Sequence, residues 1–148
     1  MTRIVSLLGA VVLALAGCRP AAQSCAVCQR AECRGLTFQV ELANGKTVAT
    51  CCPRCGLLFA KSQQVRHLWA TDFSSGRRID ATTAVYVEAS DVSHCAAMET
   101  KRDAYGCCFY KGFDRCQPSL LAFADRAAAV KFQQVHGGQV VTLEKVSR

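Results

Sequence analysis

Cysteine is the residue type that most constrains what this chain can fold into, because eleven cysteines occur in 148 residues and most of them are clumped. After Cys18 the groups are Cys25, Cys28 and Cys33, then Cys51, Cys52 and Cys55, then Cys95, and finally Cys107, Cys108 and Cys116. Neighbouring Cα atoms lie about 3.8 Å apart, below the roughly 4.4 to 6.8 Å of an unstrained disulfide. Disulfides between adjacent cysteines are therefore disfavoured, and thiolate ligation of a metal competes with a disulfide framework.

The first residues have the pattern of a secretion signal rather than of a folded domain. Arg3 gives a positive start, and residues 4–16 form an apolar run that is too short to span a bilayer stably. The run ends in Leu-Ala-Gly-Cys at 15–18, which resembles the bacterial lipobox, in which the cysteine is lipidated and becomes the first residue. We predict a signal peptide over 1–17, lipid attachment at Cys18 and a tether over 18–24. An ordinary signal peptide cleaved nearby is the alternative.

We expect this anchored chain to lie on the periplasmic side of a bacterial membrane, a compartment in which disulfides can form. Arg19 after the lipid cysteine, in place of aspartate, favours the outer membrane. Removal of residues 1–17 takes away Arg3, so the formal net charge of +7 becomes +6. The basic residues are scattered and are not interleaved with aromatic residues. The charge therefore indicates a solvated surface and no nucleic-acid partner.

The hydrophobic pattern predicts a hairpin that leads into a helix. Residues 37–42 alternate between apolar and polar side chains, Asn44 and Gly45 are typical of a tight turn, and residues 47–51 return as a second strand. Pro53 suits the first turn of a helix, because the amide that it lacks would have no partner there. Apolar residues at helical spacing extend this helix to about Arg66.

The rest of the chain repeats the same order of elements around the segment 89–119, which is rich in cysteine and has no clear periodicity. The further elements that we predict are strands over 68–73, 84–88, 120–124 and 139–143 and a helix over 126–136. Its inner face is predicted to hold Ala128, Ala129, Phe132 and Val135. Residues 25–148 are thus predicted to be α+β, with two small ββαβ units (about 25–83 and 84–148) related by internal duplication, an N-terminal cysteine knuckle and a cysteine-rich loop.

Two Cys-x-x-Cys pairs flank the predicted hairpin, one before it and one at the start of the helix. Thiolates three residues apart at a turn or a first helical turn point the same way, so each pair supplies half of a tetrahedral site. A helix N-terminus also lowers thiol pKa values. The sequence therefore predicts a copper(I) or zinc site made of Cys25, Cys28, Cys52 and Cys55, with disulfides between the pairs as the alternative. Cys51 is expected to face away from Cys52, with a disulfide to Cys33 as one option.

A second candidate cluster of soft ligands lies in the cysteine-rich loop and its surroundings. Its members are His94, Cys95, Met98, Cys107, Cys108 and Cys116. Thiolate, thioether and imidazole together suit copper(I) or another thiophilic ion better than calcium or magnesium. Two disulfides that staple the loop are the alternative.

Two stretches of the sequence resemble the NosL family, lipoproteins that accompany nitrous oxide reductase and act as copper(I) chaperones. They are WATDFSSGRRIDATTAVYVE at 69–88 and LLAFADRAAAVKFQQVHGGQVV at 120–141, together with the lipobox and the first cysteine pair. The chain departs from the family at Gln29 and Arg30, where a methionine usually follows the cysteine pair. It also carries cysteines in place of a Met-Gly-rich segment, for which Met98 could stand in.

The resemblance implies a soft-metal chaperone or scavenger without turnover, with a fold related to the organomercurial lyases. It also implies a metal-receiving partner, nitrous oxide reductase or another cuproprotein. Two alternatives stay open. One is a disulfide-stapled lipoprotein that binds a protein partner without metal, and the other is a thiol enzyme resembling the organomercurial lyases, with Cys52 and Cys55 at its helix start.

Overall fold

The computed structural model describes residues 24–30, 35–92, 100–102, 108–110 and 115–146. The predicted signal peptide and the lipid attachment at Cys18 lie outside the described residues, as do Cys33, His94, Cys95, Met98 and Cys107. Cys108 is described as part of a short strand. Within the described ranges, no helix is both long enough and apolar enough to cross a membrane.

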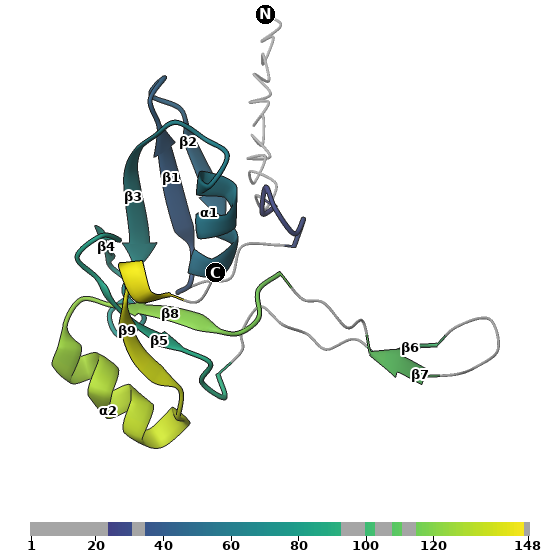
Figure 1. Ribbon diagram of the computed structural model, residues 1–148, viewed down its shortest axis with the longest axis vertical. Coiled ribbons are helices and arrows are strands. Elements are labelled where there is room, and N and C mark those ends of the chain that lie inside the picture. Colours follow the sequence, from purple (N-terminus) through teal and green to yellow (C-terminus); the bar gives the residue numbers. More distant parts are fainter. Residues whose placement is uncertain (1–23, 31–34, 93–99, 103–107, 111–114, 147–148) are drawn as a thin grey trace, which may run out of the picture.

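The first half of the described chain forms a four-stranded antiparallel sheet with one helix packed on it (Figure 1). Its elements are β1 (Phe38–Leu42), β2 (Thr47–Thr50), α1 (Pro53–Ala60), β3 (Val65–Thr71) and β4 (Arg78–Asp80), in the sheet order β2-β1-β3-β4. The predicted turn joins β1 to β2. Gly45 adopts a φ of +83° there, a conformation that glycine reaches without strain.

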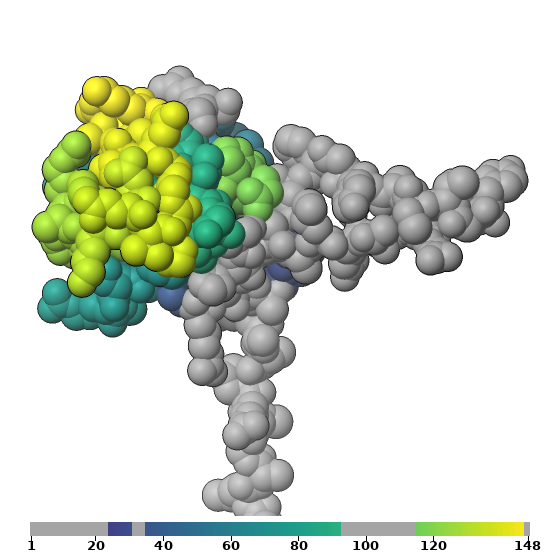
Figure 2. All heavy atoms as spheres, turned by 90° about the horizontal axis from the view of Figure 1, so that it is seen from below, coloured from purple at the N-terminus to yellow at the C-terminus, as the bar shows by residue number. Residues whose placement is uncertain are grey.

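The second half forms a three-stranded antiparallel sheet with the second helix on one face. Its elements are β5 (Val85–Glu88), β8 (Leu120–Phe123), α2 (Arg126–His136) and β9 (Gln139–Thr142), in the sheet order β8-β5-β9. Figure 2, seen from this end of the molecule, shows α2 and β9 covering much of the surface. Two short paired strands, β6 (Thr100–Arg102) and β7 (Cys108–Tyr110), come after β5 and before β8 in the sequence. A 3-10 helix (Leu143–Lys145) follows β9.

Both sheets have the same topology. In each, the first strand is central, the second pairs on one side of it, and the strand that follows the helix pairs on the other side. The series β1, β2, α1, β3 therefore corresponds to β5, β8, α2, β9. This confirms the α+β fold class and the two ββαβ units predicted from the sequence, with β4 as an addition to the first sheet.

Strands β5 and β8 contribute to two buried clusters because their side chains alternate between two covered faces. One face packs beneath α2 and contributes Val87, Leu121 and Phe123. The other face points to the first sheet and contributes Tyr86, Leu120 and Ala122. All four residues of β8 are buried as a result. The cluster beneath α2 continues into six cysteine side chains at the other end of β8.

The first helix is shorter than predicted, since it ends at Ala60 rather than near Arg66. Strand β3 begins at Val65 and ends at Thr71, in place of the predicted 68–73. The open edge of β1 explains the difference: its backbone groups need partners, and pairing with β3 from Val65 onward supplies them. Helical spacing of apolar residues could not reveal this competition.

Two other expectations also need correction. Val135 was expected on the inner face of α2, but it is 72% exposed, because Ala128, Ala129 and Phe132 form the face that packs on the sheet. The segment 89–119 was expected to lack periodic structure, yet it contains the paired strands β6 and β7. Three-residue strands are too short to show a recognisable alternation.

Candidate metal centre

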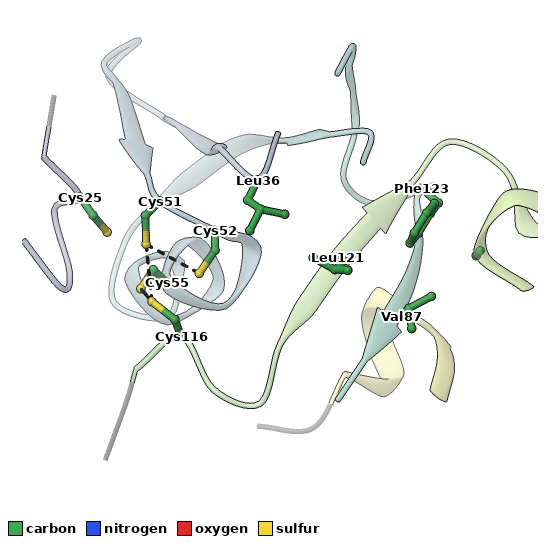
Figure 3. Close-up of a cluster of buried hydrophobic side chains, with 10 residues drawn as sticks. Cys25, Leu36, Cys51, Cys52, Cys55, Val87, Cys116, Leu121 and Phe123 are labelled. Atoms are coloured by element: carbon green, nitrogen blue, oxygen red, sulfur yellow. Dashed lines mark hydrogen bonds between the residues drawn. The ribbon is translucent and has the colours of Figure 1, made fainter. Parts of the chain in front are cut away.

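Six cysteine side chains converge at one place in the fold, where the N-terminal segment, the start of α1 and the approach to β8 meet. They are Cys25, Cys28, Cys51, Cys52, Cys55 and Cys116. Figure 3 shows all of them except Cys28. Five are buried, and Cys28 is half-buried. No disulfide joins any two of these six cysteines.

The sulfur atoms lie at the separations that a shared metal requires. Cys51 Sγ is 3.4 Å from Cys28 Sγ, 3.6 Å from Cys116 Sγ and 3.8 Å from Cys52 Sγ. Cys116 Sγ is 3.7 Å from Cys55 Sγ and 4.0 Å from Cys28 Sγ. A tetrahedral ion with metal–sulfur bonds of ~2.3 Å holds its sulfur ligands about 3.8 Å apart. The cluster therefore has the dimensions of a thiolate metal site without large movements.

Local structure explains why three of the thiols come together from five consecutive positions. Pro53 occupies the first turn of α1, Cys52 is the extended residue that precedes the helix, and Cys55 lies one turn further along. Strand β2 ends at Thr50, so Cys51 is no longer held in the alternation of a strand. The expectation that Cys51 faces away from Cys52 is therefore wrong, and its sulfur lies between the others.

Backbone amides favour the thiolate form of Cys25. Burial raises its pKa, but backbone N–H groups of Cys28, Cys51 and Val27 lower it further than burial raises it, so the net shift is downward. The Val27 N–H donates to the sulfur at 3.4 Å. A buried thiolate in this position is ready to accept a metal without a nearby base.

The thiols also shift one another's pKa values, because each can donate to a neighbouring sulfur. Hydrogen bonding with Cys116 lowers the pKa of Cys52, and hydrogen bonding from Cys51 lowers the pKa of Cys116 to about 7. The same contact with Cys116 raises the pKa of Cys51. Arg30 Nη1 also donates to Cys116 Sγ at 3.6 Å and adds a positive charge beside the cluster. The pKa values of Cys52 and Cys116, like that of Cys25, therefore lie below the ordinary value of a thiol.

A buried ion pair holds the Cys116 segment against α1. Arg54, next to Cys55 in the helix, contacts Glu88 at the end of β5 with an N–O distance of 2.5 Å. Its Nε also donates to the carbonyl oxygen of Pro118 at 3.2 Å. One side chain thereby links the helix, the second sheet and the chain that follows Cys116.

The structure regroups the predicted ligands. Two sets of four sulfurs each lie mutually within 4.8 Å: Cys25, Cys28, Cys51 and Cys55 form one, and Cys51, Cys52, Cys55 and Cys116 form the other. Cys52 thus does not belong to the set that contains Cys25 and Cys28. Cys116, which was assigned to the second predicted cluster, lies instead with Cys51, Cys52 and Cys55. The remaining second-cluster side chains are not described, so that cluster stays a prediction.

Sequence reasoning missed Cys51 because it relied on Cys-x-x-Cys spacing, although a cysteine directly before a helix-start pair was itself a usable signal. No local signal could have placed Cys116. It lies 65 positions from Cys51 and reaches the cluster through the pairing of β8 with β5.

The donor set is chemically uniform, because six sulfurs and no carboxylate or imidazole make up the two four-ligand sets. Thiolate ligands suit copper(I) and zinc and are poor ligands for calcium and magnesium. These residues therefore fit the soft metals predicted from the sequence.

Comparison with known proteins was made on the sequence and on the structure. No family model matches the chain, and the search of curated proteins found no match. The structure is similar to the crystal structure of the copper chaperone NosL from Shewanella denitrificans, with a TM-score of 0.60 over 85% of this chain and 90% of that chain. This chain has the NosL fold. At 16% sequence identity the likeness to NosL shows the fold alone, and it confirms at that level the resemblance seen in the sequence.

Proposed function

We propose that this protein is a carrier of soft metal ions, with copper(I) as its cargo, and that it passes the ion to a receiving protein. The observation that carries this proposal is the convergence of six cysteine sulfurs in two overlapping sets of four, each set lying mutually within 4.8 Å. A thiolate donor set selects copper(I) or zinc. The NosL fold, known from a copper chaperone, favours copper(I) of the two.

The exposure of the thiols supports transfer by ligand exchange at one side of the cluster. Five of the sulfurs are buried, whereas Cys28 is half-buried, so an incoming ligand from a partner reaches the metal most easily there. Exchange at Cys28 lets the ion remain bound to the buried thiolates until the partner has engaged. The partner would be nitrous oxide reductase or another cuproprotein.

The N-terminal sequence supports a periplasmic location and a lipid anchor at Cys18. Expression of the full chain with labelled palmitate tests this part. We expect label in the membrane fraction for the native sequence and none for Cys18→Ser. Label on neither protein would contradict the anchor and leave metal binding untouched.

Metal binding is tested by titrating the reduced full chain with copper(I) in the presence of a competing chromogenic chelator. We expect the protein to withdraw copper from the chelator, and we expect Cys51→Ser to weaken this by at least tenfold, because its sulfur contacts three others. Zinc in the same assay shows which ion is preferred. Ser62→Ala, on the exposed surface beyond α1, serves as a control and should bind as the native chain does.

Two outcomes would contradict the proposal. Absence of bound metal, with the cysteines found oxidised in thiol counting, would favour the disulfide-stapled lipoprotein. Catalytic cleavage of an organomercurial by the reduced chain would favour the thiol enzyme.

A further inference from the structure

The two sets of four sulfurs overlap in a specific way. Cys51 and Cys55 belong to both sets, Cys25 and Cys28 belong to the first alone, and Cys52 and Cys116 belong to the second alone. Two tetrahedra that share an edge have this composition: two bridging ligands and two terminal ligands on each side. We infer that the cluster holds two metal ions that share Cys51 and Cys55, an inference that rests on the proposed metal binding.

The sulfur distances support the bridging role of Cys51. Its sulfur lies 3.4 Å from Cys28, a terminal member of the first set, and 3.6 Å from Cys116, a terminal member of the second. Cys28 and Cys116, terminal members of different sets, also lie 4.0 Å apart, so the two sets adjoin there as well. Figure 3 shows Cys51 between Cys25 and Cys52, with Cys55 and Cys116 beside it.

A single ion leaves two of the six sulfurs without a metal, although each of these two lies within 4.8 Å of Cys51 and Cys55. One tetrahedral ion uses four ligands. If the ion binds the first set, Cys52 and Cys116 remain. They are buried, with 4% exposure each. A second ion there would use them as ligands.

The test counts metal ions in a full chain in which the five cysteines outside this cluster are replaced by serine. These five are Cys18, Cys33, Cys95, Cys107 and Cys108. The reduced protein is loaded with copper(I), passed through a competing chelator and measured by native mass spectrometry. We expect two ions per chain. In the same background we expect one ion for Cys25→Ser, one for Cys116→Ser and none for Cys51→Ser.

Cys25 and Cys51 form a matched pair for this test, because both side chains are fully buried and lose the same atom. Equal copper counts for these two variants would overturn the bridging assignment. One ion in the parent protein would overturn the two-ion inference while leaving the proposed function in place, and four ions would replace the pair by a larger cluster. No bound copper would overturn both proposals.

X-ray absorption at the copper edge of the loaded native chain keeps the inference testable if the variants do not fold. Two ions that share two sulfurs with bonds of ~2.3 Å must lie on the order of 3 Å apart. We expect a copper–copper scattering shell at that distance. Sulfur scattering alone would overturn the shared site.

Discussion

Gly56 determines how closely helix α1, which carries Cys55, approaches strand β1. A Cβ atom at this position would lie 2.1 Å from the Cδ1 atom of Phe38, whose ring is fully buried. The absence of a side chain therefore sets the position of the helix start relative to the first sheet. At the scale of single residues, the cysteine cluster depends on this contact as well as on the cysteines themselves.

Gly56→Ala is predicted to destabilise the protein, because the added methyl group would overlap the buried ring of Phe38. Overpacking of this kind costs about 2 kcal/mol, measurable as a lower free energy of unfolding in urea. The control is the same substitution combined with Phe38→Leu, in which the smaller side chain should reduce the cost of the alanine. An unchanged unfolding midpoint for Gly56→Ala would show that α1 can shift without penalty.

At the scale of the elements, the ion pair between Arg54 and Glu88 connects parts of the chain that are distant in sequence. Arg54 lies in α1, Glu88 ends β5, and Pro118 precedes β8. The side chains of Arg54 and Glu88 are 14% and 9% exposed. Breaking one partner of a buried pair is costly because the other charge loses its compensation.

Arg54→Ala is therefore predicted to lower the free energy of unfolding by about 3 kcal/mol. It should also weaken copper binding at the side of the cluster that contains Cys116, since that segment loses its contact with the helix. Replacement of both partners, by Arg54→Met and Glu88→Met together, should cost less than Arg54→Ala alone. If the double variant were the less stable one, the ion pair would be contributing more than charge compensation.

At the scale of the whole molecule, the two sheets are joined through Asp72 and its neighbour. The backbone N–H of Phe73 donates to the carbonyl oxygen of Ala122 in β8 at 2.8 Å, and the N–H of Ala124 donates to Asp72 Oδ1 at 3.0 Å. Burial raises the pKa of Asp72, but hydrogen bonds from Ser75 and Ala124 lower it more, so the net pKa lies below its ordinary value of 3.8. The ionised carboxylate therefore stabilises the joint.

A lowered pKa in the folded state means that Asp72 contributes stability above the unfolded pKa of about 4, and that this contribution is lost as the pH falls through the folded value. Asp72→Asn is predicted to be less stable than the native chain at pH 6, with a difference that shrinks toward pH 3. Urea unfolding of both proteins across this range tests it. A difference that stays constant with pH would exclude the carboxylate charge as the cause.

The sequence alone determined the parts of this protein that depend on local pattern. Alternation at 37–42, the turn at Asn44 and Gly45, and Pro53 before an apolar segment specify a hairpin and a helix start through neighbouring residues. The helix at 126–136 is specified in the same way, and Asp125 caps it as its oxygen accepts from the Ala128 N–H at 2.8 Å. The two-unit α+β fold followed from these elements, because each unit repeats the same order.

Tertiary structure alone decided which sulfurs meet. Cys116 contacts Cys55 although 61 positions separate them in the sequence. This contact exists because β8 pairs with β5 and because Arg54 in α1 binds the carbonyl oxygen of Pro118, between Cys116 and β8. Cys51 enters the cluster because its strand ends one residue earlier, at a point set by pairing with β1. Spacing along a chain can place two thiols on one turn of a helix, but the convergence of six from three segments depends on long-range packing that no local pattern encodes.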